Sequence, residues 1–148
     1  LVDQALFQDI DVRVDIEPGL PRMAGDMGQL QQVFTNLFIN AADAMEGKGA
    51  LAVKARYDAE KERFVITVSD TGPGIPEELR DKVFEIFFTT KPVGKGTGLG
   101  LSISRKIIEL HGGDLSYDSS PEGGTTFTME LPLGYLEQTS EADDVFVD

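Results

Sequence analysis

The stretch Gln32-Val-Phe-Thr-Asn36-Leu-Phe-Ile-Asn40-Ala-Ala-Asp43 combines an apolar stripe with an unusual row of carboxamides. At 100° per residue, Asn36 and Asn40 fall on one narrow polar face of a helix whose neighbouring face is apolar. Asparagine is a mediocre helix former, because its side chain competes for backbone hydrogen bonds. Two asparagines four residues apart therefore either belong to a solvated polar face or are placed there to bind something.

The sequence on either side of this stretch switches between strand and helix periodicity. Asp26 is the predicted N-cap of a helix that runs to about Glu46. The predicted strands are Ile10–Glu17, which alternates strictly and should be half-buried, Leu51–Tyr57, Phe64–Asp70, Asp114–Asp118 and Thr125–Leu131. The other predicted helical segments are the end of a helix at Leu1–Gln8, a short helix opened by Pro76, and Leu99–Leu110. This order predicts an α+β fold: a two-layer α/β sandwich in which a mixed, mostly antiparallel sheet has helices on one face.

Composition limits what this chain can do. Its 148 residues carry a net charge of −13 and no cysteine, which argues against binding nucleic acid, a disulfide framework and a thiolate metal site. No apolar run reaches membrane-spanning length, and no signal peptide is visible. Because Leu1 is not a start methionine, we expect a piece of a longer protein. Residues 134–148 are acidic and carry no base, which predicts a solvated linker, with partner docking through Val145-Phe-Val147 as the alternative.

A second signal is the aspartate that ends the strand Phe64-Val-Ile-Thr-Val-Ser-Asp70. The alternate apolar residues of this strand share a face with Asp70, so its carboxylate faces burial and needs a partner. The exocyclic amino group of a purine can supply that partner, and Gly72 and Gly74 would let a ring approach the backbone closely. The alternative is a turn aspartate that caps the following residues.

A third signal is the loop Gly94-Lys-Gly-Thr-Gly-Leu-Gly100, in which glycines alternate and a helix follows directly. The backbone amides of such a loop and of the helix N-terminus can cradle phosphates. Lys91 and Lys95 add positive charge, and Thr97 adds a hydroxyl. Asn40 would serve the same site as a hard oxygen ligand for Mg²⁺, which takes further oxygens from phosphates and water. The alternative for the loop is a flexible linker.

Five short motifs occur in a fixed order: Asn36-Leu-Phe-Ile-Asn40-Ala, Asp70-Thr-Gly-Pro-Gly74, Phe84-Glu-Ile-Phe-Phe-Thr-Thr-Lys91, Gly96-Thr-Gly-Leu-Gly100 and Gly124-Thr-Thr-Phe127. In this combination the chain resembles the catalytic ATP-binding domain of bacterial sensor histidine kinases, within the superfamily that includes gyrase, Hsp90 and MutL. The run Phe-Phe-Thr-Thr-Lys-Pro resembles kinases of the nitrogen-regulatory and oxygen-sensing type. The resemblance covers residues 1–133 and implies a Bergerat-type fold with ATP held under a lid.

The resemblance implies a role for each motif. Asn40 would be the Mg²⁺ ligand, Asn36 and Lys91 would act near the phosphates, and Asp70 would bind the adenine amino group. For Asp43, a solvated helix residue is the alternative to a binding role. The other residues implied in ATP binding are Gly72, Gly74, Ile75, Phe88, Gly96, Thr97, Gly98, Leu99, Gly100, Leu101 and Thr126, or Thr125 in its place, through water.

One position separates two kinds of chemistry within the resembled superfamily. Its ATP-hydrolysing members carry a glutamate four residues before the metal asparagine, as general base for water. This chain has Asn36 there, which cannot take a proton. The resemblance therefore implies phosphoryl transfer to a supplied nucleophile, by positioning and electrostatic stabilisation. An ATPase of the same superfamily and a non-catalytic nucleotide-binding module are the alternatives.

The acceptor histidine is expected outside this chain. The only histidine, His111, follows a predicted helix, where it would cap the C-terminus favourably for the helix dipole. In the resembled kinases the acceptor lies on a dimerisation domain N-terminal to the catalytic one, and residues 1–8 would be the end of the connection. The implied partners are that domain and a response regulator, with the isolated domain a monomer and the full kinase a homodimer. A cytoplasmic location is expected, without nucleic-acid or direct membrane contact, which leaves open a membrane anchor elsewhere. The signal, the response regulator and any receiver domain after residue 148 stay open.

Overall fold

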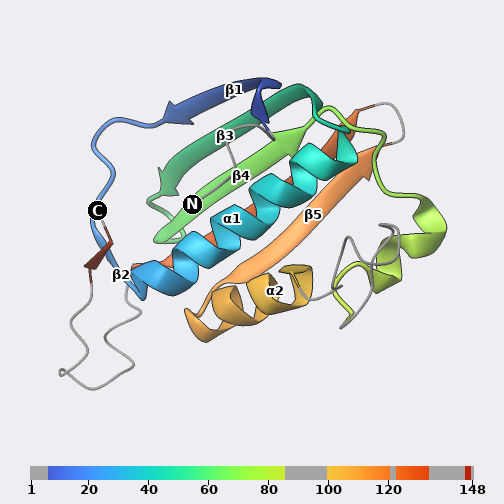
Figure 1. The fold of residues 1–148 in the computed structure, drawn as a ribbon. Helices are drawn as coiled ribbons and strands as arrows, with labels where there is room; N and C mark the ends of the chain where they lie inside the picture. Colours follow the sequence, from blue (N-terminus) through green and yellow to red (C-terminus); the bar gives the residue numbers. More distant parts are fainter. Residues whose placement is uncertain (1–6, 86–99, 121–122, 134–145, 148) are drawn as a thin grey trace.

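The computed structural model describes residues 7–85, 100–120, 123–133 and 146–147. In chain order, the elements are β1 (Asp9–Ile16), β2 (Met23–Ala24), α1 (Met27–Ala44), β3 (Lys48–Asp58), β4 (Arg63–Asp70), the 3-10 helix η2 (Glu77–Lys82), α2 (Gly100–Leu110), β5 (Asp114–Ser120), β6 (Gly124–Pro132) and β7 (Phe146–Val147). Helices α1 and α2 lie on one face of a five-stranded sheet (Figure 1). The predicted α+β sandwich is confirmed.

The sheet has the strand order β1-β3-β4-β6-β5. Strand β1 pairs with β3 in parallel, and the other pairs are antiparallel, so the sheet is mixed as predicted. Because β3, β4, β6 and β5 run antiparallel, the end of β4 lies beside the start of β6 and the end of β5. This arrangement gathers Asp70, Thr125 and Ser119 at one end of the sheet.

Helix α1 begins where the sequence predicts. Asp26 is its N-cap, and the Asp26 Oδ1 accepts a hydrogen bond of 3.0 Å from the Gln29 backbone N–H. The helix ends at Ala44, two residues before the predicted end at Glu46. Glu46 has a φ of 54° and Gly47 a φ of 81°, which lie outside the right-handed helical region. A left-handed turn therefore ends α1 and sends the chain into β3.

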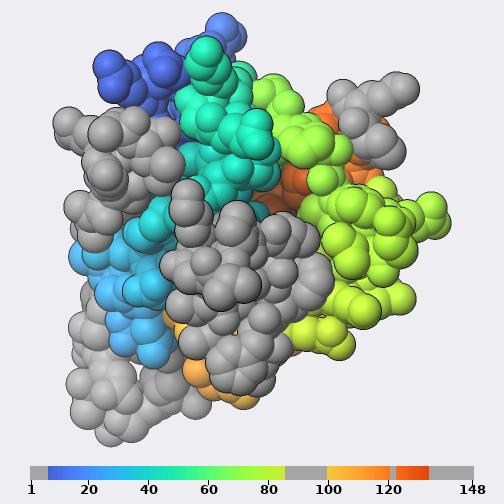
Figure 2. Space-filling model, turned by 45° about the vertical axis from the view of Figure 1, so that its right-hand side comes forward, coloured from blue at the N-terminus to red at the C-terminus, as the bar shows by residue number. Residues whose placement is uncertain are grey.

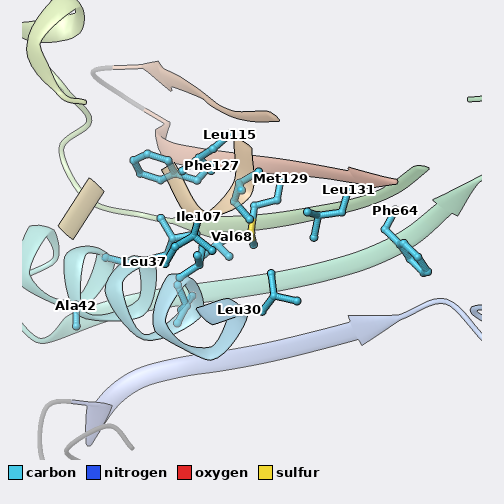
Figure 3. Packing of buried hydrophobic residues seen from close by; sticks show 14 of the residues in the cluster. Leu30, Leu37, Ala42, Phe64, Val68, Ile107, Leu115, Phe127, Met129 and Leu131 are labelled. Atoms are coloured by element: carbon cyan, nitrogen blue, oxygen red, sulfur yellow. The ribbon is translucent and has the colours of Figure 1, made fainter. Parts of the chain in front are cut away.

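The core lies between the two helices and the sheet. Helix α1 contributes Leu30, Val33, Leu37, Ala41 and Ala42, all buried. Figure 3 shows Leu37 of α1 and Ile107 of α2 close to Val68 of β4, with Met129 of β6 in the same cluster. The apolar stripe predicted beside the carboxamides is thus the face that packs on the sheet.

Strand β1 differs from its predicted burial. The sequence predicts a half-buried strand at Ile10–Glu17, but of its apolar residues only Ile10 is buried. Val12, Val14 and Ile16 are 47%, 61% and 58% exposed. Because β1 forms the edge of the sheet, its side chains lack the cover that the helices give the strands farther in (Figure 1). Alternation indicated the strand correctly, but it could not show that the helix layer stops short of the edge.

Two short strands were not predicted. Met23–Ala24 forms β2 and pairs antiparallel with Phe146–Val147 of β7. Strand β7 lies near the end of the 134–148 segment that the sequence predicts to be a solvated linker, so the chain returns to the domain at 146–147. Strands of two residues are too short to show periodicity. Among the described residues, none of the helices has the length and apolarity needed to cross a membrane.

Candidate functional site

The carboxylate of Asp70 lies buried at the end of β4. Asp70 is 5% exposed, which confirms the burial predicted from the strand pattern. Its Oδ1 accepts a 2.9 Å hydrogen bond from the Gly72 N–H. Burial raises the pKa of Asp70 above its ordinary value of 3.8, while hydrogen bonds from the backbone amides of Gly72 and Thr125 act in the opposite direction. The fold thus keeps a costly buried carboxylate in a fixed orientation, as a receptor for a hydrogen-bond donor requires.

The loop after β4 comes very close to its neighbours at two glycines. A Cβ on Gly72 would lie 3.1 Å from the Asp70 Oδ1 and 3.3 Å from the Ala44 carbonyl oxygen. Gly74 has a φ of 81°, and a Cβ there would collide with the Ser120 carbonyl oxygen. Close protein atoms therefore favour glycine at both positions, and the predicted approach of a purine ring stays a prediction. Figure 2 shows η2, which follows this loop, in yellow-green on the same face of the molecule as part of α1.

The two candidate threonines lie on opposite faces of the sheet. Thr125 pairs with Asp70 across β4 and β6 and shares its face, and the Thr125 amide bonds the Asp70 carboxylate. Thr126 pairs with Ser69, and their hydroxyl oxygens are 2.8 Å apart on the other face. Of the two alternatives, Thr125 is the one that shares the face of Asp70, because strand side chains alternate and a shift of one residue reverses the face. Thr125 is the threonine next to Asp70.

Asn36 joins the two helices. Its Nδ2 donates to the Gly100 carbonyl oxygen at 3.2 Å and to the Ser104 Oγ at 3.1 Å, and its Oδ1 accepts from the Gln32 Nε2 at 3.0 Å. Asn36 is therefore not simply a solvated helix residue: it holds the first turn of α2 against α1. Ser104, which is fully buried, was missed by sequence reasoning. Its spacing of three residues from Ile107, on the apolar face of the predicted helix, is the signal that could have revealed it.

The remaining predicted residues of α1 and α2 are placed as follows. Asn40 lies one turn after Asn36 and is half-buried, whereas Asp43 is exposed. Gly100 is the first residue of α2, and Leu101 packs against the core. Ile75 follows Gly74, and its N–H donates to the Ser119 Oγ at 2.6 Å. The other predicted residues lie outside the described ones: Phe88, Lys91, Gly96, Thr97, Gly98 and Leu99.

His111 is a buried link between the helices rather than a charged cap. It is fully buried, and its Nε2 accepts a 3.0 Å hydrogen bond from the Asp26 N–H. Its Nδ1 therefore carries the proton and donates to the Ile107 carbonyl oxygen at 2.8 Å. The expected capping of α2 is present, but through a neutral ring that also contacts the N-cap of α1. Because the ring is neutral, the predicted favourable interaction of a positive charge with the dipole of α2 does not arise.

The donor set suits a magnesium ion that shares its ligands with phosphates. The half-buried Asn40 offers a neutral carboxamide oxygen, which is a hard donor. Across the part of the chain that the structure describes, no group of three or more His, Cys, Asp or Glu side chains could hold a metal ion. A protein cage of carboxylates is thus not formed by these residues, whereas a single oxygen ligand with phosphate and water oxygens fits them.

Comparison with known proteins places the chain in a family. Residues 25–135 match the family described as "Histidine kinase-, DNA gyrase B-, and HSP90-like ATPase". The sensor kinase CckA of Brucella abortus is 41% identical over 97% of this chain, and the chain spans 16% of its length. Among solved structures, a nucleotide-free catalytic domain of the histidine kinase ThkA has a TM-score of 0.71 and 38% identity, over 84% of this chain and 81% of that chain.

A further solved structure is a full-length kinase. ShkA in complex with AMPPNP has a TM-score of 0.75 and 29% identity, over 87% of this chain and 27% of that chain. The match to ThkA covers most of an isolated catalytic domain, whereas the matches to CckA and ShkA cover only a part of longer proteins. With the sheet, the helix pair and the buried Asp70 in place, the chain belongs to the histidine kinase, gyrase B and HSP90-like ATPase family, as a catalytic domain of the sensor histidine kinase kind.

Proposed function

We propose that this domain binds Mg-ATP and donates the γ-phosphoryl group to a histidine on a separate dimerisation domain of the same kinase. The observation that carries the proposal is Asp70, a buried carboxylate held by two backbone amides beside glycines that approach it closely. A buried acceptor of this kind suits the 6-amino group of adenine. The structure of ShkA in complex with AMPPNP supports a nucleotide as the ligand.

The rest of the proposed site follows from the two helices. Asn40 would hold the magnesium ion, which neutralises charge on the phosphates when bound. The amides at the N-terminus of α2 would face the phosphates, and Asn36 keeps that turn in place by binding the Gly100 carbonyl oxygen. Lys91 would add positive charge near the transferred group. Because transfer needs mainly positioning and electrostatics, a site without a general base on α1 suits it.

Hydrolysis is the alternative reaction for a family that includes ATPases. The position on α1 that carries a glutamate in hydrolysing relatives is Asn36, and its amide is already engaged in three hydrogen bonds. A carboxamide cannot accept a proton from water, so Asn36 cannot serve as the general base for hydrolysis. We therefore favour transfer to a histidine over turnover by the isolated domain.

The test is a phosphotransfer assay. The domain is mixed with γ-labelled ATP, Mg²⁺ and a histidine-bearing dimerisation domain, and the label on the second protein is tested for acid lability. We expect acid-labile label with the unaltered domain and a large loss with Asp70→Asn, while Asp118→Asn, an exposed change on β5, serves as the control. Tight ATP binding without label on histidine would contradict the kinase proposal. Steady ATP hydrolysis by the domain alone would favour an ATPase.

The proposed partners are the dimerisation domain and a response regulator that accepts the phosphoryl group afterwards. We propose a monomer for the isolated domain and a cytoplasmic homodimer for the full kinase. Sedimentation of the isolated domain checks the first of these, because a stable dimer would contradict it. Nucleic acid is not proposed as a partner, because a net charge of −13 disfavours binding to a phosphate backbone.

A further inference from the structure

Ser119, on β5, is a buried hub that the motifs do not include. It is 6% exposed, and its hydroxyl accepts from the Ile75 N–H at 2.6 Å. The same oxygen lies 3.0 Å from the Thr125 Oγ1 and 3.4 Å from the Gly124 carbonyl oxygen. One hydroxyl thus joins the loop after β4 to the start of β6. Sequence reasoning placed Ser119 in a connection, because β5 was predicted to end at Asp118 and ends at Ser120.

The Ser119 hydroxyl is connected to the Asp70 carboxylate through one residue. Thr125 lies opposite Ser119 across β5 and β6, and opposite Asp70 across β4 and β6. Its hydroxyl meets Ser119, while its backbone amide bonds the Asp70 carboxylate. Thr125 is itself 6% exposed, so little water can replace a lost partner. A chain of buried hydrogen bonds therefore connects the Asp70 carboxylate, through Thr125, to Ser119.

The backbone of Ser119 anchors a second piece of the same region. The Arg80 guanidinium donates from Nη2 to the Ser119 carbonyl oxygen, and the Tyr117 hydroxyl donates to the Arg80 carbonyl oxygen at 2.9 Å. These contacts fix η2 against β5. The Ser119 side chain lies between Gly74 and Thr125: a Cβ on Gly74 would be 3.0 Å from the Ser119 Oγ, and the Thr125 Oγ1 is 3.0 Å from the same atom.

We infer that Ser119 is a positioning residue for nucleobase recognition, acting on Asp70 through Thr125 and on Gly74 through the Ile75 amide. The inference rests on the proposed function, because it assumes that Asp70 receives the 6-amino group of adenine. Loss of the Ser119 hydroxyl leaves the Ile75 N–H without its acceptor and releases the Thr125 side chain. The loss should weaken the contact between the Asp70 carboxylate and the base most. Binding of the phosphates, on the α1 and α2 side, should change least.

The test compares two nucleotides that differ at one group. Mg-ATP and Mg-purine riboside triphosphate, which lacks the 6-amino group, are titrated calorimetrically against the domain. A hydrogen bond to a charged group makes the unaltered domain prefer ATP by about tenfold or more. We expect Ser119→Ala to reduce this preference about threefold to tenfold. Ser119→Thr, which keeps the hydroxyl, should restore most of it. Ser116→Ala, an exposed change on the same strand, should leave it unchanged.

Each result bears on the inference. An undiminished preference for ATP in Ser119→Ala would overturn it, as would equal losses for both nucleotides, which indicate a general structural role. If Ser119→Ala does not fold, Ser119→Cys, which replaces the hydroxyl with a weakly hydrogen-bonding thiol, gives the same test, again with Ser119→Thr as the restoring variant. The proposed function is tested separately: if Asp70→Asn binds both nucleotides like the unaltered domain, the base site itself is wrong. If Asp70→Asn loses the preference and Ser119→Ala keeps it, only the role of Ser119 fails.

Discussion

The base side and the helix side of the proposed site are held by different kinds of interaction. On the base side, a buried carboxylate, close glycines and backbone amides are arranged around Asp70. On the helix side, neutral groups join α1 to α2: Asn36 to Gly100 and Ser104, and Asp26 to His111. The comparison teaches that the first side carries a desolvation cost that two backbone amides offset only in part, whereas the polar groups of the second side are already paired without a ligand. Changes on the base side should alter binding most, and changes on the helix side should alter stability most.

The largest effect on stability is expected at His111. His111→Ala removes a fully buried ring, its hydrogen bond from the Asp26 amide at the start of α1 and its hydrogen bond to the Ile107 carbonyl of α2, so the free energy of unfolding should fall by about 2–4 kcal/mol. Urea denaturation followed by circular dichroism measures it. Glu109→Ala, an exposed change on the same helix, is the control and should cost little. A loss as small as that of the control would show that the helix side is not held as described.

Asp70→Asn should have the largest effect on ligand affinity. The amide keeps the size of the carboxylate but loses its charge, so ATP should bind about 10- to 100-fold more weakly. Isothermal titration calorimetry measures the change, with Asp118→Asn as the control. Unchanged affinity would remove the base side from the proposed site.

The same residue should also give a pH signature. Burial raises the folded-state pKa of Asp70 above 3.8, so the folded state binds its proton more tightly than the unfolded state does. This contribution to stability is fully present below pH 3.8 and is lost as the pH rises through the folded-state pKa. Without nucleotide at pH 7, Asp70→Asn should therefore be more stable than the unaltered domain, and the gap should narrow as the pH falls toward 3.8. Denaturation of both proteins across pH 4–7 measures the difference in their unfolding free energies. A difference that does not change with pH would contradict the prediction.

Ser104→Ala sharpens the comparison on the helix side. It removes one of the two acceptors of the Asn36 amide and should cost about 0.5–1.5 kcal/mol in unfolding free energy. The preference for ATP over purine riboside triphosphate should stay as it is, unlike in Ser119→Ala. A lost preference in Ser104→Ala would show that the two sides are not separate.

The smallest effect is expected where the two sides meet. The Arg105 guanidinium of α2 lies 4.5 Å from the ring centroid of Phe84, which packs on Tyr117 and Phe127 near the base side. Arg105→Gln keeps part of the stem and removes the charge, so stability should fall by about 0.5–1 kcal/mol. Thermal unfolding measures it, and Arg105→Lys should recover part of the loss. A loss well above 1 kcal/mol would mean that Arg105 couples the two sides strongly.

Features that depend on local sequence patterns were predicted correctly, whereas features that depend on strand register or on cover by the helices were not. Sequence reasoning predicted α1, its N-cap and the burial of Asp70, because each depends on a local pattern. It misjudged the burial of β1, since an alternating strand looks the same at the edge of a sheet and under a helix. It left Thr126 and Thr125 open as alternatives, because β-strand faces depend on register, which the run of two threonines does not reveal.

By itself, the sequence determined the mixed sandwich, the buried aspartate, the glycines beside it and the row of carboxamides on α1. These follow from periodicity and from the backbone freedom of glycine, which act over a few residues. Only the tertiary structure decided what the polar groups do: Asn36 ties α1 to α2, His111 is a neutral link, and Ser119 supports Asp70 through Thr125. Their partners lie far along the chain, and hydrogen bonding is settled by distance in space, not by distance in sequence.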